Sequence, residues 1–246
     1  MHLPRSGRRM NKTAIAFGTF DGVHRGHQEI INAMLSAAKR GGLDPLIYTF
    51  SNHPAGLFGK SFSMIMTDGE RLAALKGFAP VAAERLDRQL AGTSPEDFAL
   101  RMVEQYGMKA AVAGFNYTFG SRGAGNMDTL RRLGGKYGFE VYEIPALMYG
   151  GEPVSSTRIR ACIERGDIAG ANAMLGHELE LSCKETSQNG HAVLKVADGL
   201  VLPAPGRYIT EAEGRRLVCG VLPGGSIEPE EPLNGPKKLR FIDRIG

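Results

Sequence analysis

The sequence of 246 residues has no tryptophan, little aromatic content (7%) and only three cysteines, Cys162, Cys183 and Cys219. Because the cysteines are odd in number and widely spaced, with no Cys-x-x-Cys pair, they exclude a disulfide framework and indicate a reducing compartment, the cytoplasm. No apolar run approaches the ~18 residues of a membrane-spanning helix. The apolar run after the basic N-terminus is too short for a signal peptide, so no membrane association is expected.

A strong charge of either sign is also absent: 30 Lys and Arg face 26 Asp and Glu, a formal net charge of +4. This excess is too small to indicate a nucleic-acid-binding protein. The chain is 42% hydrophobic and 23% charged, which is typical of a soluble globular protein. Glycine, by contrast, is abundant, with 33 residues, and predicts many tight turns and loops that approach a ligand closely.

Short apolar runs alternate with segments of helical periodicity over the first 144 residues. The predicted strands are residues 13–17, 46–50, 110–113 and 139–144. The predicted helices are residues 27–40, one opened by a Thr67–Glu70 capping box, one opened by Ser94-Pro95-Glu96, and residues 128–137. Strands separated by helices indicate βαβ units, and therefore an α/β fold with an open, mainly parallel sheet.

The pattern changes after this region. Residues 156–176 read as two helices, the first interrupted by Gly166 and the second opened by Asp167. Short alternating segments with Gly and Pro between them then predict antiparallel β structure. We therefore expect a first domain over residues 1–180 and a small β-rich module over residues 181–246, which is marginal in size for folding alone.

The most informative segment is Gly18-Thr-Phe-Asp-Gly-Val-His-Arg-Gly-His27, which joins the first predicted strand to the first predicted helix. In an open parallel sheet, ligands bind at such a loop, and the helix N-terminus behind it attracts anions. His24 and His27 could donate hydrogen bonds to phosphate oxygens, while Gly26 leaves room for a nucleotide. The segment matches neither G-x-G-x-x-G nor G-x-x-x-x-G-K-[ST], which disfavours an NAD site and a P-loop.

Two other interpretations of the histidine pair stay open, namely surface polarity and zinc binding. Zinc would require a third and a fourth ligand. The other histidines, at positions 2, 53, 177 and 191, form no obvious cluster in the sequence, so no metal site is predicted.

A second segment, Val154-Ser-Ser-Thr-Arg-Ile-Arg160, begins a predicted helix. Ser155, Ser156 and Thr157 offer hydroxyl groups and unpaired backbone N–H groups, and Arg160 lies one turn further on the same face. Hydroxyl, amide and guanidinium donors together suit a polyphosphate. The alternative is an ordinary helix cap followed by a solvated arginine.

Taken together, G-x-F-D-G-x-H-x-G-H and the distal S-S-T-x-x-R resemble the nucleotidyltransferase superfamily with the His-x-Gly-His signature, and most closely the bacterial FAD synthetase family. Residues 49–54 (TFSNHP) are similar to the family's T-F-x-P-H-P loop, with Asn52 in place of a proline. Residues 114–120 (GFNYTFG) resemble its G-x-[DN]-F-x-F-G turn, with Tyr117 in place of the first Phe. The resemblance extends over residues 12–180.

This resemblance implies a Rossmann-like nucleotidyltransferase domain that acts as an FMN adenylyltransferase, with ATP and FMN as substrates and Mg²⁺ held on the phosphates mostly through water. It implies catalytic roles for His24, His27 and Arg160. The implied ATP- and phosphate-binding residues are Gly18, Thr19, Phe20, Asp21, Gly22, Gly26, Gly114, Ser155, Ser156 and Thr157. The implied flavin-binding residues are Asn52, His53, Pro54 and Asn116. His53-Pro54 and Asn116 could alternatively be simple turn residues.

Full-length relatives in this family carry a C-terminal riboflavin kinase barrel with a G-R-x-L-G-F-P-T-A-N signature, which residues 181–246 lack. We therefore expect a truncated, riboflavin-kinase-like remnant that is too short to build that barrel, and no kinase activity. We also expect a chain ending near Gly176 to keep some adenylyl transfer. Transfer to another phosphate acceptor and a non-catalytic flavin or nucleotide sensor remain as alternative functions.

Overall fold

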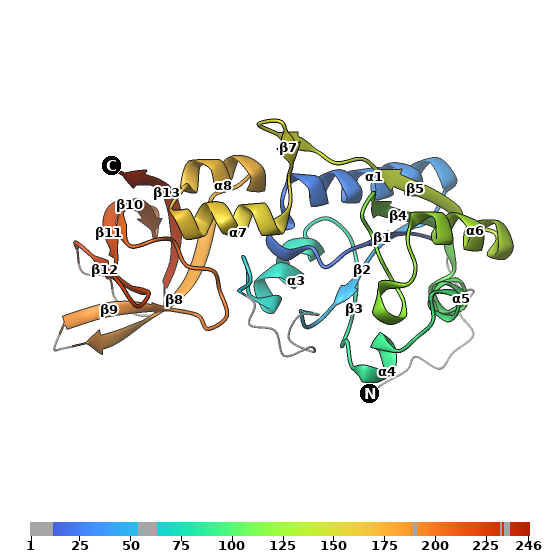
Figure 1. The fold of residues 1–246 in the computed structure, drawn as a ribbon, viewed down its shortest axis with the longest axis horizontal. Coiled ribbons are helices and arrows are strands. Elements are labelled where there is room, and N and C mark those ends of the chain that lie inside the picture. Colours follow the sequence, from blue (N-terminus) through green and yellow to red (C-terminus); the bar gives the residue numbers. More distant parts are fainter. Residues whose placement is uncertain (1–11, 54–62, 189–190, 232, 234–236) are drawn as a thin grey trace. The chain divides into compact units, whose positions relative to one another are not determined.

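The computed structural model describes residues 12–53, 63–188, 191–231, 233 and 237–246 (Figure 1). The chain divides into two compact units. The first comprises Met1–Thr19, Glu29–Leu57 and Leu75–Pro145, and the second comprises Phe20–Gln28, Phe58–Ala74 and Ala146–Gly246. Each unit is therefore built from segments that are distant in the sequence.

The first unit contains a five-stranded, fully parallel sheet in the order β3-β2-β1-β4-β5. Its strands are β1 (Thr13–Phe17), β2 (Asp44–Phe50), β3 (Val81–Glu84), β4 (Met108–Gly114) and β5 (Glu140–Ile144). The strand order reverses between β1 and β4, which is the position where open α/β sheets bind ligands. The predicted α/β class with an open parallel sheet is confirmed.

Four of the five described helices between Arg25 and Tyr137 begin within two residues of their predicted starts, and the short helix over residues 88–91 was not predicted. The five helices are α1 (Arg25–Gly41), α3 (Asp68–Lys76), α4 (Arg88–Ala91), α5 (Pro95–Tyr106) and α6 (Met127–Tyr137). The predicted capping box is confirmed: Glu70 N–H donates to Thr67 Oγ1 at 3.3 Å, and Thr67 N–H donates to Glu70 Oε2 at 3.0 Å. Strand β3 was not predicted, because its four residues (VAAE) are short and rich in helix-favouring alanine and glutamate.

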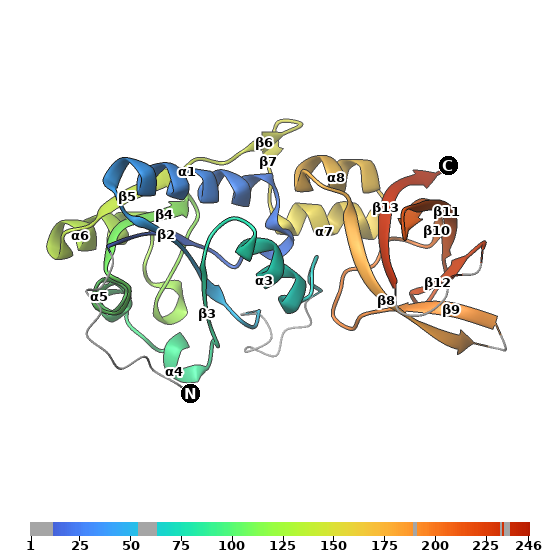
Figure 2. The ribbon, with the colours of Figure 1, turned by 180° about the vertical axis from the view of Figure 1, so that it is seen from behind.

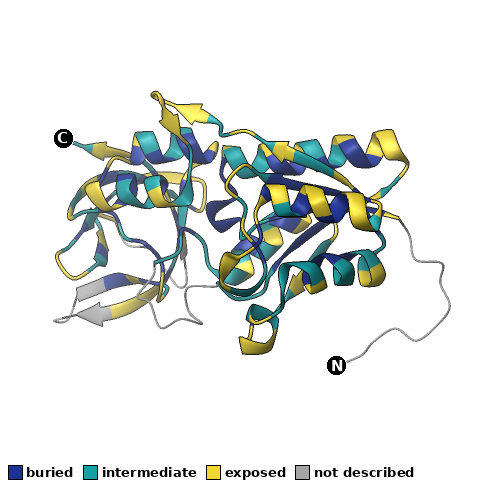
Figure 3. Cartoon of the chain, turned by 45° about the vertical axis from the view of Figure 1, so that its right-hand side comes forward, coloured by how far each residue is buried: buried dark blue, intermediate teal, exposed yellow. Residues whose placement is uncertain are grey.

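The core of the first unit lies on the sheet. Strand β1 is buried along its whole length. Phe17, Tyr48, Phe98 and Met102 belong to one buried cluster, as the apolar patterns predicted. Figure 3 shows the strands of the sheet as mostly buried and the outer faces of the helices as exposed.

The second unit contains α7 (Ser156–Arg165), α8 (Ile168–Leu175), a two-stranded ribbon of β6 (Met148–Tyr149) and β7 (Glu152–Pro153), and a closed barrel. The barrel strands are β8 (Leu179–Gln188), β9 (His191–Val196), β10 (Gly206–Ala212), β11 (Arg215–Val221), β12 (Ser226–Pro229) and β13 (Lys237–Ile245). All barrel pairings are antiparallel, in the order β10-β11-β12-β9-β8-β13 (Figures 1 and 2). The predicted antiparallel module is confirmed, and its strands of only 4 to 10 residues close into a barrel, which the alternating pattern alone did not predict.

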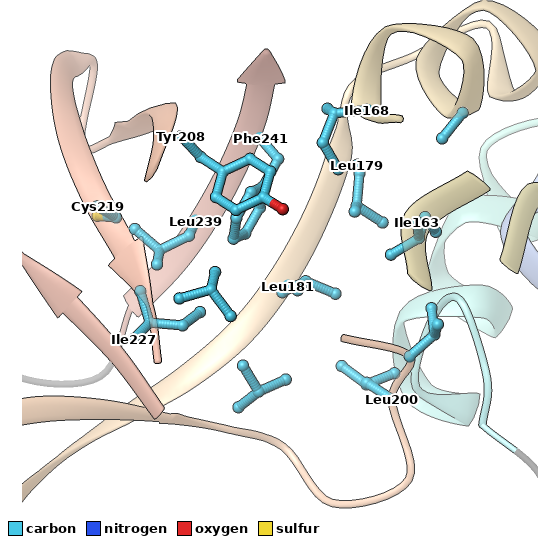
Figure 4. Close-up of a cluster of buried hydrophobic side chains, with 14 of the residues drawn as sticks. Ile163, Ile168, Leu179, Leu181, Leu200, Tyr208, Cys219, Ile227, Leu239 and Phe241 are labelled. Carbon is cyan, nitrogen blue, oxygen red and sulfur yellow. The ribbon is translucent and has the colours of Figure 1, made fainter. Parts of the chain in front are cut away.

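One hydrophobic core joins the helices of the second unit to its barrel. Ile163 of α7 and Ile168 of α8 share a buried cluster with Leu179, Leu181 and other barrel residues (Figure 4). Asn172 of α8 adds polar links, because its Nδ2 donates to Phe241 O at 2.8 Å and its Oδ1 accepts from Leu179 N–H at 2.8 Å. A chain ending near Gly176 would divide this core, and the expectation for such a chain stays a prediction.

Candidate functional site

The loop that follows β1 has an unusual backbone. Phe20 (φ 56°), Gly22 (φ 79°) and Val23 (φ 39°) are left-handed. For valine, a β-branched residue, this region is a rare outlier, and such strain clusters at functional sites. A Cβ on Gly22 would lie 2.9 Å from Ile65 Cδ1, so this position requires glycine for space as well as for conformation.

His24 ends this loop and caps α1. Its carbonyl accepts from the backbone N–H groups of His27 (2.7 Å) and Gln28 (3.0 Å), and its Nδ1 lies 3.3 Å from the same His27 nitrogen. The two imidazole rings stack with centroids 3.5 Å apart and planes 15° apart, and Phe20 packs edge-on against His27. A Cβ on Gly26 would come within 3.3 Å of the His24 ring, so glycine leaves space for this arrangement.

Both histidines are neutral at pH 7. Burial lowers the pKa of His24 to about 4. Burial also lowers the pKa of His27 well below its usual value, and the Arg71 guanidinium and, when protonated, the His24 ring add to this shift. Since Nδ1 of His24 accepts a hydrogen bond, the neutral ring carries its proton on Nε2. Nδ1 of His27 is buried and has no hydrogen-bond partner among the described residues. The pair therefore suits hydrogen bonding to an anionic ligand.

Asp21 pairs with Arg160 in the second unit. Asp21 Oδ2 accepts from Arg160 Nη1 at 2.8 Å, and Asp21 Oδ1 accepts from the N–H groups of Ile65 (3.0 Å) and Met66 (3.4 Å). The two side chains are 2% and 14% exposed. Burial raises the pKa of the Asp21 carboxyl, while the Ile65 hydrogen bond and the Arg160 charge oppose that shift. We expected Asp21 to bind phosphate; instead both of its oxygens bind protein donors, and a carboxylate would repel phosphate.

The hydroxyl groups that begin α7 also have protein partners. Ser155 caps the helix, accepting from Arg158 N–H at 3.2 Å, and Ser156 Oγ donates to Asp21 O at 3.0 Å. Thr157 Oγ1 accepts from Arg160 Nη2 at 3.2 Å. The first turn of α7 and Arg160 thus form one hydrogen-bonded group with the Asp21 loop, as the spacing of Ser156, Thr157 and Arg160 suggested.

Two residues near this group were not predicted from the sequence. Arg71 is 2% exposed and pairs with Asp68 at 2.7 Å, and its charge acts on both Asp21 and His27. His177 bridges two carbonyl groups, Gly22 O and Glu178 O, at 3.0 Å each. The only sequence signal for Arg71 was its place in the first turn of the capped helix, and His177 had none.

The remaining candidate residues lie in the first unit, with Gly18 and Thr19 after β1 and with Gly114 and Asn116 after β4. Tyr117 N–H donates to Gly114 O at 2.9 Å and closes a turn in which Asn116 is exposed. His53 is half-buried, and Pro54 lies outside the described residues.

Asn52 has a structural role. Its Nδ2 donates to Leu86 O at 3.1 Å, and its Oδ1 accepts from Leu86 N–H at 2.8 Å. Both ends of the amide therefore bind backbone, and flavin binding by Asn52 stays a prediction. The segment after β2 is thereby fastened to the segment after β3.

In the part of the chain that the structure describes, no three His, Cys, Asp or Glu side chains are grouped as metal ligands would be. None of the described helices combines the length and the apolar character required to cross a membrane.

Comparisons with known proteins agree with the resemblance seen in the sequence. Residues 7–158 match a family model described as FAD synthetase. The FAD synthetase of Listeria monocytogenes is 31% identical over 203 residues, which cover 80% of each chain. The bifunctional riboflavin kinase/FMN adenylyltransferase of Bacillus subtilis is 32% identical over 171 residues, which cover 67% of this chain but only 54% of that protein.

Among solved structures, a protein from Streptococcus pneumoniae described as a macrolide-efflux protein superposes with a TM-score of 0.81. The match covers 97% of this chain and 87% of that one, at 24% identity. At this identity the likeness concerns the fold alone.

Proposed function

The chain belongs to the FAD synthetase family, and from this membership we propose that it transfers the AMP group of ATP to FMN, giving FAD and pyrophosphate. The observation that supports this most is the stacked, neutral pair His24 and His27 at the N-terminus of α1. Arg160, whose charge acts on His24, belongs to the same unit. Together they supply neutral and cationic donors for a chain of phosphates.

In the proposed reaction, an FMN phosphate oxygen attacks the α-phosphorus of ATP, and the bond from that phosphorus to the pyrophosphate oxygen breaks. Both groups are already ionised at pH 7, so no general base is required. Catalysis then depends on positioning and on stabilising charge at the phosphoryl oxygens. We assign that stabilisation to ring N–H groups of His24 and His27, with the N-terminus of α1 behind them.

The leaving pyrophosphate is assigned to Arg160 and the first turn of α7. A guanidinium binds phosphate oxygens through two parallel hydrogen bonds, and the helix N-terminus adds backbone N–H donors at Ser156 and Thr157. The backbone of Gly18–Phe20 and the turn at Gly114 are proposed to face adenosine. His53, Pro54 and Asn116 are proposed for the flavin side.

Mg²⁺ is proposed to enter with ATP, bound to its phosphates. The chemistry of the site does not fit a protein-held Mg²⁺, which prefers carboxylate oxygens. Asp21, the acidic residue of the loop, already uses both oxygens on protein donors. The free thiols of Cys162, Cys183 and Cys219 suit the cytoplasm, the compartment that we propose.

We further propose that residues 1–180 form the adenylyltransferase domain and that residues 181–246 are a riboflavin-kinase-like remnant without kinase activity. Support comes from the sequence, which lacks the kinase signature in that segment.

Pyrophosphate release tests the function. The chain is incubated with ATP and FMN, and separately with ATP and other phosphomonoesters, while FAD is followed by chromatography. We expect equal amounts of FAD and pyrophosphate from ATP and FMN, and no pyrophosphate from ATP and the other phosphomonoesters. Pyrophosphate with another phosphomonoester would indicate a different acceptor, and FMN binding without pyrophosphate release would indicate a sensor; either result would contradict the proposal.

A further inference from the structure

A turn of the barrel holds the segment around Met64. The N–H of Met64 donates to Gly199 O at 2.7 Å, and Met64 O accepts from the N–H of Val201 at 2.8 Å. These two bonds form an isolated parallel bridge between Met64 and Leu200, in the connection from β9 to β10. Two hydrogen bonds from the barrel therefore hold the backbone at Met64.

The next two residues hold Asp21. The N–H groups of Ile65 and Met66 both point to Asp21 Oδ1, at 3.0 and 3.4 Å. The Ile65 side chain is 1% exposed and belongs to the same buried cluster as Leu200 and Leu175. The Ile65 side chain also packs against the loop that contains Asp21, because its Cδ1 would lie 2.9 Å from a Cβ at Gly22.

Asp21 in turn orients Arg160 through the 2.8 Å bond to Nη1. Hydrogen bonds, joined by the backbone from Met64 to Met66, thus connect Gly199 and Val201 through Asp21 to the Arg160 guanidinium. A second link joins the barrel to α3, because Ser182 Oγ of β8 donates to Glu70 Oε1 at 2.5 Å. All of these residues belong to the second unit.

From these contacts we propose that the barrel is a positioning scaffold for adenylyl transfer. The turn at Gly199–Val201 fixes residues 64–66, those residues fix Asp21, and Asp21 orients Arg160 toward the pyrophosphate group. Asp21 is then a positioning residue and binds no substrate itself. This inference rests on the proposed function for its reaction, but its central claim concerns how the chain binds pyrophosphate.

The test uses two matched glycines in barrel turns. Gly199 (φ 80°) and Gly214 (φ 74°) are both exposed and have left-handed backbones. A side chain would fit at either position, because the nearest atom to an added Cβ is Met64 Cε at 3.9 Å for Gly199, and nothing lies within 4 Å for Gly214. A valine strains either backbone similarly. Only the turn at Gly199 pairs with Met64, so only Gly199→Val should disturb Arg160.

We expect Gly199→Val and Asp21→Asn each to weaken the binding of inorganic pyrophosphate, measured by calorimetry on the full chain, by about tenfold or more. The turnover number should fall in parallel while the KM for FMN stays within about twofold. Gly214→Val should leave both unchanged at a similar thermal midpoint. Because Asp21 and Gly199 act through one series of contacts, the double variant should lose less than the sum of the two single losses.

Equal effects at Gly199 and Gly214, or additive losses in the double variant, would overturn the proposal and leave the barrel with a role in stability alone. If Gly199→Val does not fold, Gly199→Ala and Gly214→Ala give the same comparison with a smaller strain. Pyrophosphate binding separates this inference from the proposed function. A wild-type chain that binds pyrophosphate but makes no FAD would contradict the proposed function, while the Gly199 and Gly214 variants would still decide the scaffold role through pyrophosphate binding.

Discussion

The imidazole rings of His24 and His27 lie face to face, with 3.5 Å between their centroids. Two stacked imidazolium ions would repel each other, and burial lowers the pKa of both rings. The pair is therefore uncharged, and our proposal assigns its ring N–H groups to the phosphate oxygens of ATP.

His27→Ala should reduce turnover by ~10²–10³, as is typical when a donor to a developing oxyanion is lost. The KM for FMN should change little. His27→Phe is the matched control, because a phenyl ring keeps the packing against His24 and Phe20 but has no N–H. Steady-state kinetics should show both variants impaired, and near-normal turnover in either would remove His27 from the mechanism.

The depressed pKa of His24 predicts an acid-sensitive fold. The unfolded chain binds a proton at His24 below its usual pKa near 6.5, whereas the folded chain binds it only near 4. The contribution of His24 to the free energy of unfolding is therefore fully present above about pH 6.5 and is lost as the pH drops toward 4. For this one group the loss between pH 7 and pH 5 is about 2 kcal/mol.

Urea unfolding at the two pH values tests this expectation. His24→Asn is the informative variant, because asparagine can also cap a helix N-terminus but does not titrate. The variant should lose less stability than the wild type between pH 7 and pH 5. The same loss in both proteins would show that His24 does not cause the acid sensitivity.

Arg160→Lys should impair the use of ATP and leave the KM for FMN unchanged. The guanidinium contacts Asp21 through Nη1 and Thr157 through Nη2, which a single ammonium group cannot reproduce together with phosphate binding. Arg165→Lys on the same helix is the control, since Arg165 is exposed and its guanidinium lies 3.5 Å from the Cys162 thiol. Matching kinetics for the two variants would mean that Arg160 is an ordinary helix residue.

Local rules predicted much of this fold from the sequence. The strand at Thr13–Phe17 and the Thr67–Glu70 capping box appear as expected, because a continuous apolar run and a reciprocal cap depend on neighbouring residues. The two motifs that the structure brings together, the Asp21 loop and the start of α7, were singled out because they carry unusual combinations of His, Gly, Ser and Arg.

Roles that depend on distant partners were not predicted. Asp21 reads as a loop residue in a glycine-rich motif, but its partner Arg160 lies 139 residues away and the amides that bind it follow Met64. Asn52 reads as a flavin-side residue, yet its partner is the backbone of Leu86. Burial and tertiary hydrogen bonds decide such roles, and neither produces a periodic pattern that can be seen in the sequence.

The structural role of Asn52 can be tested directly. Asn52→Ala leaves a donor and an acceptor of Leu86 unpaired, which should cost about 1–3 kcal/mol of stability. Asn52→Asp keeps the acceptor for Leu86 N–H and should cost less. Thermal unfolding and FMN kinetics should show lower stability with an unchanged KM for FMN; a large rise in that KM at unchanged stability would restore the flavin-binding role.

The barrel provides the last prediction. A closed barrel is present, but residues 181–246 contain no glycine-rich loop followed by Thr-Ala-Asn that could hold a nucleotide, and the buried side chains Leu181, Leu239 and Phe241 belong to its apolar core. We therefore expect the chain to make FAD from FMN and ATP but no FMN from riboflavin and ATP. Chromatography of a riboflavin and ATP incubation, with an FMN and ATP incubation as the positive control, checks this. An FMN or FAD peak from riboflavin would show that a barrel without the signature still supports phosphoryl transfer, and the single-activity proposal would fail.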